Sequence, residues 1–222
     1  MRCCVRDACC LSVPIAPLYV RRNRRTAVRD YADRVRIPTT LTTDRLTLRP
    51  WRDDDVDFAF DLYSRWEVAR FLGRTPAVMT DRVEAERRIA RLRALEDDLR
   101  AFRVVELAGT PVGTVMLQPI PASGPEPLRP SGDTEIGWHF HPEHWGHGYA
   151  AEAARALLTA ALADLPRVVA VTYPDNAASQ RVCERIGMRR LGPTDAYYNV
   201  RMELFEASAT EESGADTPPE GS

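Results

Sequence analysis

Two glycines one residue apart, Gly146 and Gly148, stand between a run that alternates apolar and polar residues and an alanine-rich run. The alternation at residues 134–141 predicts a strand, and the run that begins at Tyr149 predicts a helix to about residue 163. A strand, a glycine turn and a helix N-terminus let backbone N–H groups converge on one anion, which the helix dipole also favours. A Cβ in the turn would hold phosphate oxygens away from the main chain. The segment therefore predicts a site for a phosphate-bearing cofactor.

The commonest phosphate-binding motifs are absent. GxxxxGK[ST] does not occur. The pattern GxGxxG, started at Gly146, has Ala151 in its third position, and no acidic residue follows a second strand as a dinucleotide fold requires. A second segment downstream adds to the signal, because Asn176 opens a predicted helix, Ser179 lies one turn later and Gly187 ends it.

Together these segments resemble the GNAT superfamily of acyl-CoA-dependent N-acetyltransferases, and within it the branch of ribosomal-protein N-terminal acetyltransferases, RimJ and RimL. The resemblance covers roughly residues 38–206. The positions that match the family's pyrophosphate loop and the start of its helix are Trp145, Gly146, His147, Gly148, Tyr149, Ala150 and Ala151. Asn176, Ser179 and Gly187 match the family's next helix, and residues 41–60 resemble the first strand and helix of the branch.

The resemblance implies an α/β (α+β) fold: a central mixed, mostly antiparallel twisted sheet flanked by helices, with two parallel strands splayed apart at the cofactor. Acetyl-CoA is then the co-substrate, with its pyrophosphate on the N–H groups of residues 146–151. The pantetheine would bond to the backbone of His139, Phe140 and His141, and Asn176 would hold the pantetheine or acetyl end. An N–H near Phe140 would polarise the thioester oxygen.

Two residues are the candidates for acid–base catalysis that the resemblance implies. Glu135 precedes Ile136 on the strand that borders the acceptor and would serve as the base, directly or through a water. The alternative interpretation of Glu135 is an ordinary exposed strand glutamate. Ser179 would protonate the leaving thiolate. Many GNAT enzymes carry a tyrosine where this chain has Cys183, and we interpret that cysteine as a buried, inert thiol.

All four histidines, His139, His141, His144 and His147, lie within nine residues. A metal site would need further ligands in a chosen geometry, and neither a carboxylate nor a cysteine is suitably placed. We therefore predict no metal. His147 is expected near the pyrophosphate and His139 beside the acceptor.

The two ends of the chain differ from its middle. The first 36 residues carry nine arginines against three aspartates, and four of the five cysteines lie in the first ten residues. We expect residues 1–37 to be a disordered basic arm and residues 207–222 a disordered acidic tail, with the acetyltransferase domain at residues 38–206. No apolar run approaches the ~20 residues that span a bilayer, and no signal peptide is evident, so we expect a cytoplasmic protein without membrane contact.

Periodicity predicts the remaining elements. Strands are expected at residues 46–51, 102–107, 112–117 and 167–172, and helices from residue 53, at 68–72, at 80–99 with Thr80 as its cap, and at 176–186. Five prolines and two glycines in residues 119–133 predict a loop there.

The sequence leaves the acceptor open between a protein N-terminal amine, such as that of a ribosomal protein, and a small-molecule amine. An α-amine with a pKa of ~8 needs less help than lysine at ~10.4. Two alternatives to catalysis remain: a GNAT-like module that binds acyl-CoA or a partner without turnover, and nucleic-acid binding through the arginine arm, which we consider weaker. The oligomeric state cannot be read from the sequence.

Overall fold

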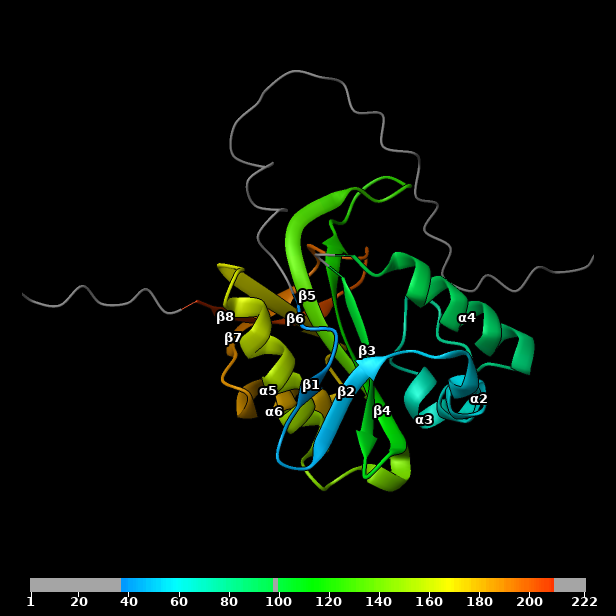
Figure 1. Cartoon of the computed structure of the whole chain (residues 1–222). Helices are drawn as coiled ribbons and strands as arrows, with labels where there is room; N and C mark the ends of the chain where they lie inside the picture. Colours follow the sequence, from blue (N-terminus) through cyan, green and yellow to red (C-terminus); the bar gives the residue numbers. More distant parts are fainter. Residues whose placement is uncertain (1–36, 98–99, 210–222) are drawn as a thin grey trace, which may run out of the picture.

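The chain forms one sheet with helices on both faces (Figure 1). The computed structural model describes residues 37–97 and 100–209, so residues 1–36 of the predicted basic arm and residues 210–222 of the predicted acidic tail lie outside the described residues. Residues 207 and 208, predicted as the start of the tail, belong to the last strand instead. The strands are β1 Leu41–Thr42, β2 Leu46–Pro50, β3 Ala101–Leu107, β4 Thr110–Pro121, β5 Pro130–Phe140, β6 Arg167–Thr172, β7 Arg189–Thr194 and β8 Met202–Ser208. The helices are α2 Val56–Ser64, α3 Trp66–Ala69, α4 Arg82–Leu95, α5 Tyr149–Leu162 and α6 Ala177–Arg185, with short 3-10 turns η1 Asp53–Asp55 and η2 Pro142–His144.

The eight strands follow the order β1-β2-β3-β4-β5-β6-β8-β7. Every neighbouring pair is antiparallel except β5 and β6, which run parallel. The predicted fold, a mixed and mostly antiparallel sheet flanked by helices, is therefore confirmed. None of the described helices is long and apolar enough to cross a membrane.

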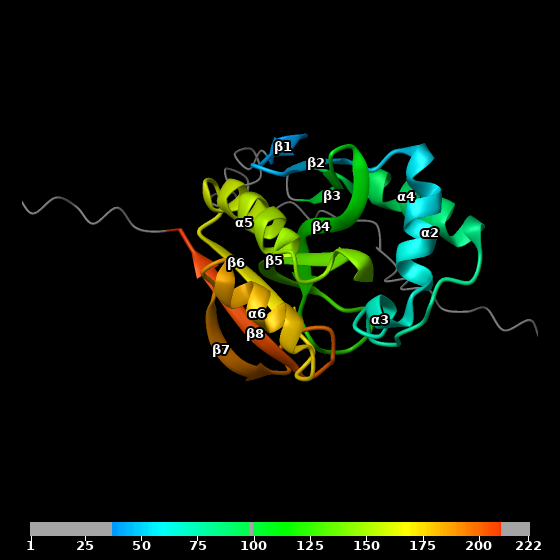
Figure 2. The ribbon, with the colours of Figure 1, turned by 90° about the horizontal axis from the view of Figure 1, so that it is seen from below.

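Two apolar layers cover the sheet, one on each face. Figure 2 shows α5 and α6 on one side and α2, α3 and α4 on the other. The larger layer packs the alanine and leucine face of α5 against strand residues such as Val115, Ile136 and Phe140. The second packs α2 and α4 against the opposite side chains of β3, among them Phe102 and Val104. Alternate residues of a strand point to opposite faces, so one strand serves both layers.

The cap of α4 differs from the prediction. Asp81, and not Thr80, is the N-cap: its carboxylate accepts a hydrogen bond from the Glu84 N–H at 2.9 Å. Thr80 instead donates its own N–H to the Glu84 carboxylate at 3.1 Å. The apolar periodicity of this helix also predicts Val83 on its inner face, but its side chain is exposed, whereas Ala85 and Ile89 are buried.

The proline-rich loop predicted at residues 119–133 is shorter than expected. β4 continues to Pro121 and β5 begins at Pro130, with Pro119 opposite Thr134. The register shifts between Pro119 and Pro121, and such irregularities are where a strand accommodates residues without an N–H. The connection itself is therefore residues 122–129.

A buried group of charges joins the first helix to the sheet. The Arg49 guanidinium of β2 donates to both oxygens of Asp55, at 2.7 and 2.8 Å, and to Glu106 of β3 at 2.7 Å. Arg49 and Asp55 are 6% and 4% exposed, so the predicted acidic helix start includes one carboxylate that water does not reach. Buried charges of this kind persist only when paired and hydrogen bonded.

We predict that Asp55→Ala lowers the free energy of unfolding by about 3 kcal/mol, because Arg49 would stay buried with one carboxylate instead of two. Asp53→Ala is the matched control, since the Asp53 side chain is 86% exposed and pairs with Arg93 at the surface. The control should change stability by no more than about 0.5 kcal/mol. Urea unfolding followed by circular dichroism measures both, and equal losses would contradict the buried role of Asp55.

Candidate functional site

The parallel strands β5 and β6 meet at one place and then separate. Their one register pair among the described residues is Glu135 opposite Val169. Beyond Glu135, β5 continues to Phe140 with β4 as its hydrogen-bonding neighbour, while β6 is paired along its length with β8. The predicted splayed pair is therefore present, and backbone on its inner side is left without a strand partner.

The glycine turn lies between β5 and α5. Gly146 and Gly148 have φ of 82° and 80°, in the left-handed region that other residues adopt only with strain, which explains glycine at both positions. A methyl group at Gly146 would project into open space, and one at Gly148 would lie 3.7 Å from Arg45 Nη2. Within the described part of the chain, the N–H groups of residues 146–151 donate no hydrogen bond. Free N–H groups at a helix start are suited to an anion.

A residue from the start of the chain holds this turn, and the sequence analysis missed it. Arg45 donates its Nε to Glu152 of α5 at 2.7 Å and its Nη1 to the His147 carbonyl at 3.2 Å. Its guanidinium also lies 4.7 Å from the centre of the Tyr149 ring, against which His147 stacks. Arg45 and Glu152 are 107 residues apart, and nothing in either local sequence links them.

Glu152 receives enough hydrogen bonds to favour its charged form. Thr43 Oγ1 donates to it at 2.6 Å and the Arg45 N–H at 3.1 Å. Burial alone would raise the pKa of Glu152, but the bonds from Thr43 and Arg45 outweigh it and the pKa is lowered. The β1–β2 turn is thus fastened to the first turn of α5, beside the free N–H groups.

The end of β5 is fixed by two contacts. Trp145 donates its indole N–H to the Phe140 carbonyl at 2.7 Å, so the turn closes over the strand end. Gly113 of β4 lies so close to the Phe140 ring that an added Cβ would approach it to 2.5 Å. The predicted cofactor residues Trp145 and Phe140 are therefore held to each other.

The backbone of His141 is already engaged. Its N–H donates to Val112 at 3.0 Å and its carbonyl accepts from His144 at 2.9 Å. The buried ring accepts a hydrogen bond from the Glu143 N–H, and its Nε2 lies 3.1 Å from the Asp61 carboxylate. In this arrangement His141 caps the turn η2, and its N–H is not available to pantetheine.

His139 lies on the face of β5 opposite to α5. Its Nδ1 is 3.2 Å from the hydroxyl of Tyr63 on α2, and the two rings meet edge to face. Burial and the nearby charge of Arg88 lower the pKa of the His139 imidazole, so the ring is neutral near pH 7. No group of three or more potential metal ligands occurs among residues 37–97 and 100–209.

Glu135 is 5% exposed, which excludes the interpretation of an ordinary exposed strand glutamate. Its Oε1 accepts hydrogen bonds from Gln118 Nε2 at 2.7 Å and from the hydroxyl of Tyr198. Burial raises the pKa of the Glu135 carboxyl, although the bonds from Tyr198 and Gln118 act in the opposite direction. The sequence analysis did not find Tyr198, which comes from the β7–β8 connection.

The predicted residues of α6 lie at its start. Asn176 is the N-cap, and its side-chain oxygen accepts from the Ser179 N–H at 3.2 Å. That bond leaves the Asn176 amide NH₂ and the Ser179 hydroxyl without a described partner. Cys183 is fully buried, which confirms that part of its prediction, and burial raises its thiol pKa to about 12.

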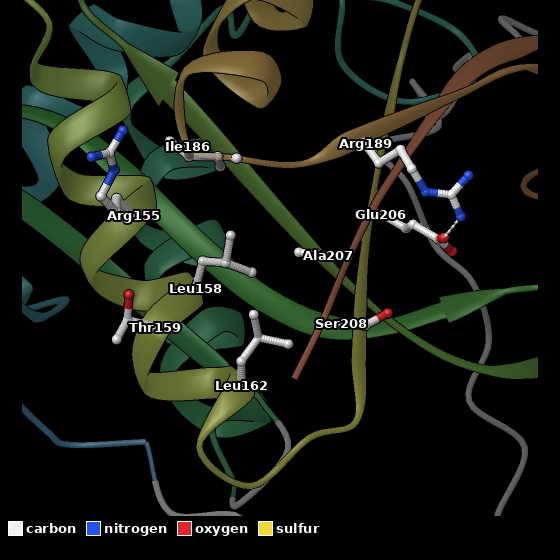
Figure 3. A pocket seen from close by; sticks show the side chains of 10 residues that line it. Arg155, Leu158, Thr159, Leu162, Ile186, Arg189, Glu206, Ala207 and Ser208 are labelled. Atoms are coloured by element: carbon white, nitrogen blue, oxygen red, sulfur yellow. Dashed lines mark hydrogen bonds and ion pairs between the residues drawn. The ribbon is translucent and has the colours of Figure 1, made fainter. Parts of the chain in front are cut away.

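A depression of about 380 Å³ lies elsewhere, between α5, the start of β7 and the end of β8 (Figure 3). Leu158, Leu162 and Ile186 form its apolar part, and Arg189 pairs with Glu206 at its edge. It contains none of the predicted site residues, so the candidate site is the opened β5–β6 pair with the glycine turn.

A mixed sheet whose parallel pair opens beside a glycine-rich helix start defines the GNAT class of fold, and comparison with known proteins agrees. The acetyltransferase (GNAT) domain family matches residues 45–189. The uncharacterized N-acetyltransferase YoaA of Bacillus subtilis (strain 168) is 30% identical over 162 residues, 71% of this chain and 86% of YoaA. The chain therefore belongs to the GNAT acetyltransferase family, a family of enzymes.

Solved structures of the same fold include RimJ and RimL. Mycobacterium smegmatis RimJ, in complex with a CoA disulfide, has a TM-score of 0.59 at 20% identity, covering 74% of this chain and 82% of that chain. RimL, a ribosomal L7/L12 α-N-protein acetyltransferase in complex with coenzyme A, has a TM-score of 0.62 at 18% identity, covering 78% and 99%. At these identities the likeness shows the fold.

We predict that Glu152→Gln lowers stability at pH 7 by about 1 kcal/mol, because Gln keeps the shape but loses the charge that pairs with Arg45. Since the pKa of Glu152 is lowered on folding, its stabilisation is complete above the ordinary carboxyl pKa of ~4.3 and is lost as pH falls through the lowered value. The difference from the unmodified chain should therefore shrink in acid. Urea unfolding at pH 7 and near pH 3 tests this, with Glu184→Gln, an exposed position on α6, as control. A difference that does not depend on pH would contradict it.

Proposed function

We propose that this enzyme transfers the acetyl group of acetyl-CoA to a primary amine, by direct attack of the amine within a ternary complex. One observation carries the proposal: the opening of β5 from β6, the free N–H groups of residues 146–151 and the buried carboxylate of Glu135 occur together. The first two features suit a long ligand with a diphosphate, and the third suits proton removal.

The residues present fit acetyl-CoA. The diphosphate would rest on the N–H groups of residues 146–151, including Tyr149, Ala150 and Ala151 at the first turn of α5, where the helix dipole favours negative charge. The open space above Gly146 is where its oxygens would lie. The pantetheine would pair with the backbone N–H of Phe140, which points away from β4, and with the Asn176 amide. His139 is two residues from His141, so its backbone faces β4 as that of His141 does, and it is not available to pantetheine.

The acetyl transfer itself needs a neutral amine and an activated thioester. The amine nitrogen attacks the carbonyl carbon, and the negative charge that develops on the oxygen would be stabilised by an N–H near Phe140. Glu135 would take the proton that the amine loses, directly or through one water. When the carbon–sulfur bond breaks, the CoA thiolate leaves and takes a proton, for which the Ser179 hydroxyl is the candidate donor.

The acceptor is either the N-terminal amine of a protein or a small-molecule amine. The shared fold with RimL, a ribosomal L7/L12 α-N-protein acetyltransferase, supports a ribosomal-protein terminus as the first class to try. One scaffold hosts many acceptors, so both classes belong in the screen.

We predict that the chain binds acetyl-CoA saturably in a calorimetric titration and that Gly148→Trp abolishes binding, because an indole at the helix start would occupy the diphosphate position. The matched control is Gly109→Trp in the β3–β4 turn, where φ is 83° and the same backbone strain arises away from the site. Loss of binding in both variants would indicate that backbone strain, and not occupation of the diphosphate position, causes the loss. No binding to the folded unmodified chain would argue against the donor.

We predict that Glu135→Gln lowers kcat by about 10²-fold or more, since a positioned base contributes roughly 10²–10⁴-fold, while acetyl-CoA affinity stays unchanged. Steady-state assays on N-terminal peptides and on polyamines, combined with the titration, separate these two quantities. Undiminished turnover in Glu135→Gln would remove Glu135 as the base. Binding without turnover on either acceptor class would favour a non-catalytic acyl-CoA-binding module.

A further inference from the structure

The carboxylate of Glu135 is bound asymmetrically. Gln118 and Tyr198 both donate to Oε1. Oε2 receives no hydrogen bond from a described residue, and it is not completely enclosed by the protein. The Oε1 atom is therefore held in place by the protein, whereas Oε2 can be reached from outside the protein.

The backbone that presents Tyr198 is strained. Tyr198 and Asn199 have φ of 59° and 55°, and a bulky residue in this left-handed region is uncommon. Such strain persists only where the surrounding structure imposes it, and it concentrates at functional positions.

The contacts that impose this conformation come from the connection of residues 122–129. The side chain of Asn199 accepts from the Gly124 N–H at 2.7 Å and donates to the Gly124 carbonyl at 2.9 Å. Its own N–H donates to Ser123 Oγ at 2.9 Å. The β4–β5 and β7–β8 connections are thus fastened together, and Tyr198 is directed from this junction towards Glu135.

We propose that Tyr198 is a positioning residue for Glu135: its hydroxyl fixes Oε1, keeps the carboxylate charged and leaves Oε2 to accept the proton of the amine. The proposal rests on the proposed function, in which Glu135 is the base. Burial raises the pKa of Tyr198, so its hydroxyl remains protonated and able to donate.

Among the described residues, Tyr198 and Gln118 donate the hydrogen bonds to Glu135, because the other polar groups nearby are paired with different partners. On the same face of β5, Asp133 pairs with Tyr197 and Arg167, and His139 is in contact with Tyr63. From the neighbouring strands, neutral Gln118 and the apolar Val169 face Glu135. The proton affinity of the carboxylate is therefore set by burial against two neutral donors.

The test uses Tyr198→Phe in the full-length chain. Loss of a donor to the charged carboxylate should raise the pKa of Glu135 by about one unit or more. The acid limb of the kcat/KM profile should move to higher pH by the same amount. At pH values below the pKa of Glu135 the variant should show about 10-fold lower kcat/KM, and well above that pKa its kcat/KM should recover. The KM for acetyl-CoA should not change.

Tyr197→Phe is the matched control. It removes a hydroxyl from the adjacent tyrosine of the same connection, but that hydroxyl donates to Asp133 at 2.6 Å and not to Glu135. A merely structural role of the connection would affect both variants alike, whereas the proposal moves the pH profile in Tyr198→Phe alone.

A second readout does not need the acceptor. In protein labelled with ¹³C at the glutamate carboxyl carbon, the Glu135 resonance is assigned by its loss in Glu135→Gln and then titrated in each variant. A higher titration midpoint in Tyr198→Phe than in Tyr197→Phe and the unmodified chain is expected. The same midpoint in all three would overturn the proposal and leave the proposed function standing. Full turnover of Glu135→Gln would instead overturn the proposed base, and with it the purpose assigned to Tyr198.

Discussion

The site depends on the way two parallel strands part after one shared pair, Glu135 opposite Val169. Each strand keeps a complete partner on its outer side, since β5 is paired with β4 and all six residues of β6 are paired with β8. The separation therefore removes only hydrogen bonds between β5 and β6. Backbone N–H and C=O groups seek partners, so the opened edge must bond to water or to a ligand. This constraint makes the opened edge suited to an extended polar ligand, which the proposed acetyl-CoA donor would supply through its pantetheine.

The opening is held by packing around the end of β5. The indole of Trp145 bonds to the Phe140 carbonyl, and the ring of Phe140 lies against the bare backbone of Gly113. Close-packed interiors transmit small displacements, so a side chain at Gly113 would displace the Phe140 ring and disturb the strand end. On the other side of the turn, Arg45 and Glu152 fasten α5 to the β1–β2 turn. The free N–H groups lie between these two anchors.

Local features of this architecture could be predicted from the sequence, and contacts between distant segments could not. The glycine turn, α5 and β6 follow from periodicity and from the conformations that only glycine adopts readily. Thr80 and Asp81 are both good helix caps, so propensity alone could not choose between them. Proline predicted a long loop where β4 and β5 in fact continue, because tertiary pairing overrides local preference at an irregular register.

The same division applies to the candidate site. Glu135 was predicted as the base from its place on the strand that borders the acceptor in the resembled family, and that role stays a prediction. Its burial could not be predicted, since burial depends on what the β7–β8 connection places above it. Arg45 and Tyr198 were missed for that reason. Each acts on a residue far along the chain, 107 residues away for Glu152 and 63 for Glu135, and neither carries a local motif.

A buried carboxylate beside an opened strand pair is a balance between two physical effects. Burial disfavours the charged form of Glu135, and two hydrogen bonds to one oxygen favour it. With too few hydrogen bonds, the buried carboxyl would stay protonated and could not accept a proton. With an arginine as ion-pair partner, its pKa would fall and it would be too weak a base. The two neutral donors oppose the effect of burial without reversing it, so the pKa of Glu135 stays raised. In the proposed reaction, a carboxylate held by a tyrosine hydroxyl and a glutamine amide, and not by a cation, would remain basic enough to take a proton from the acceptor amine.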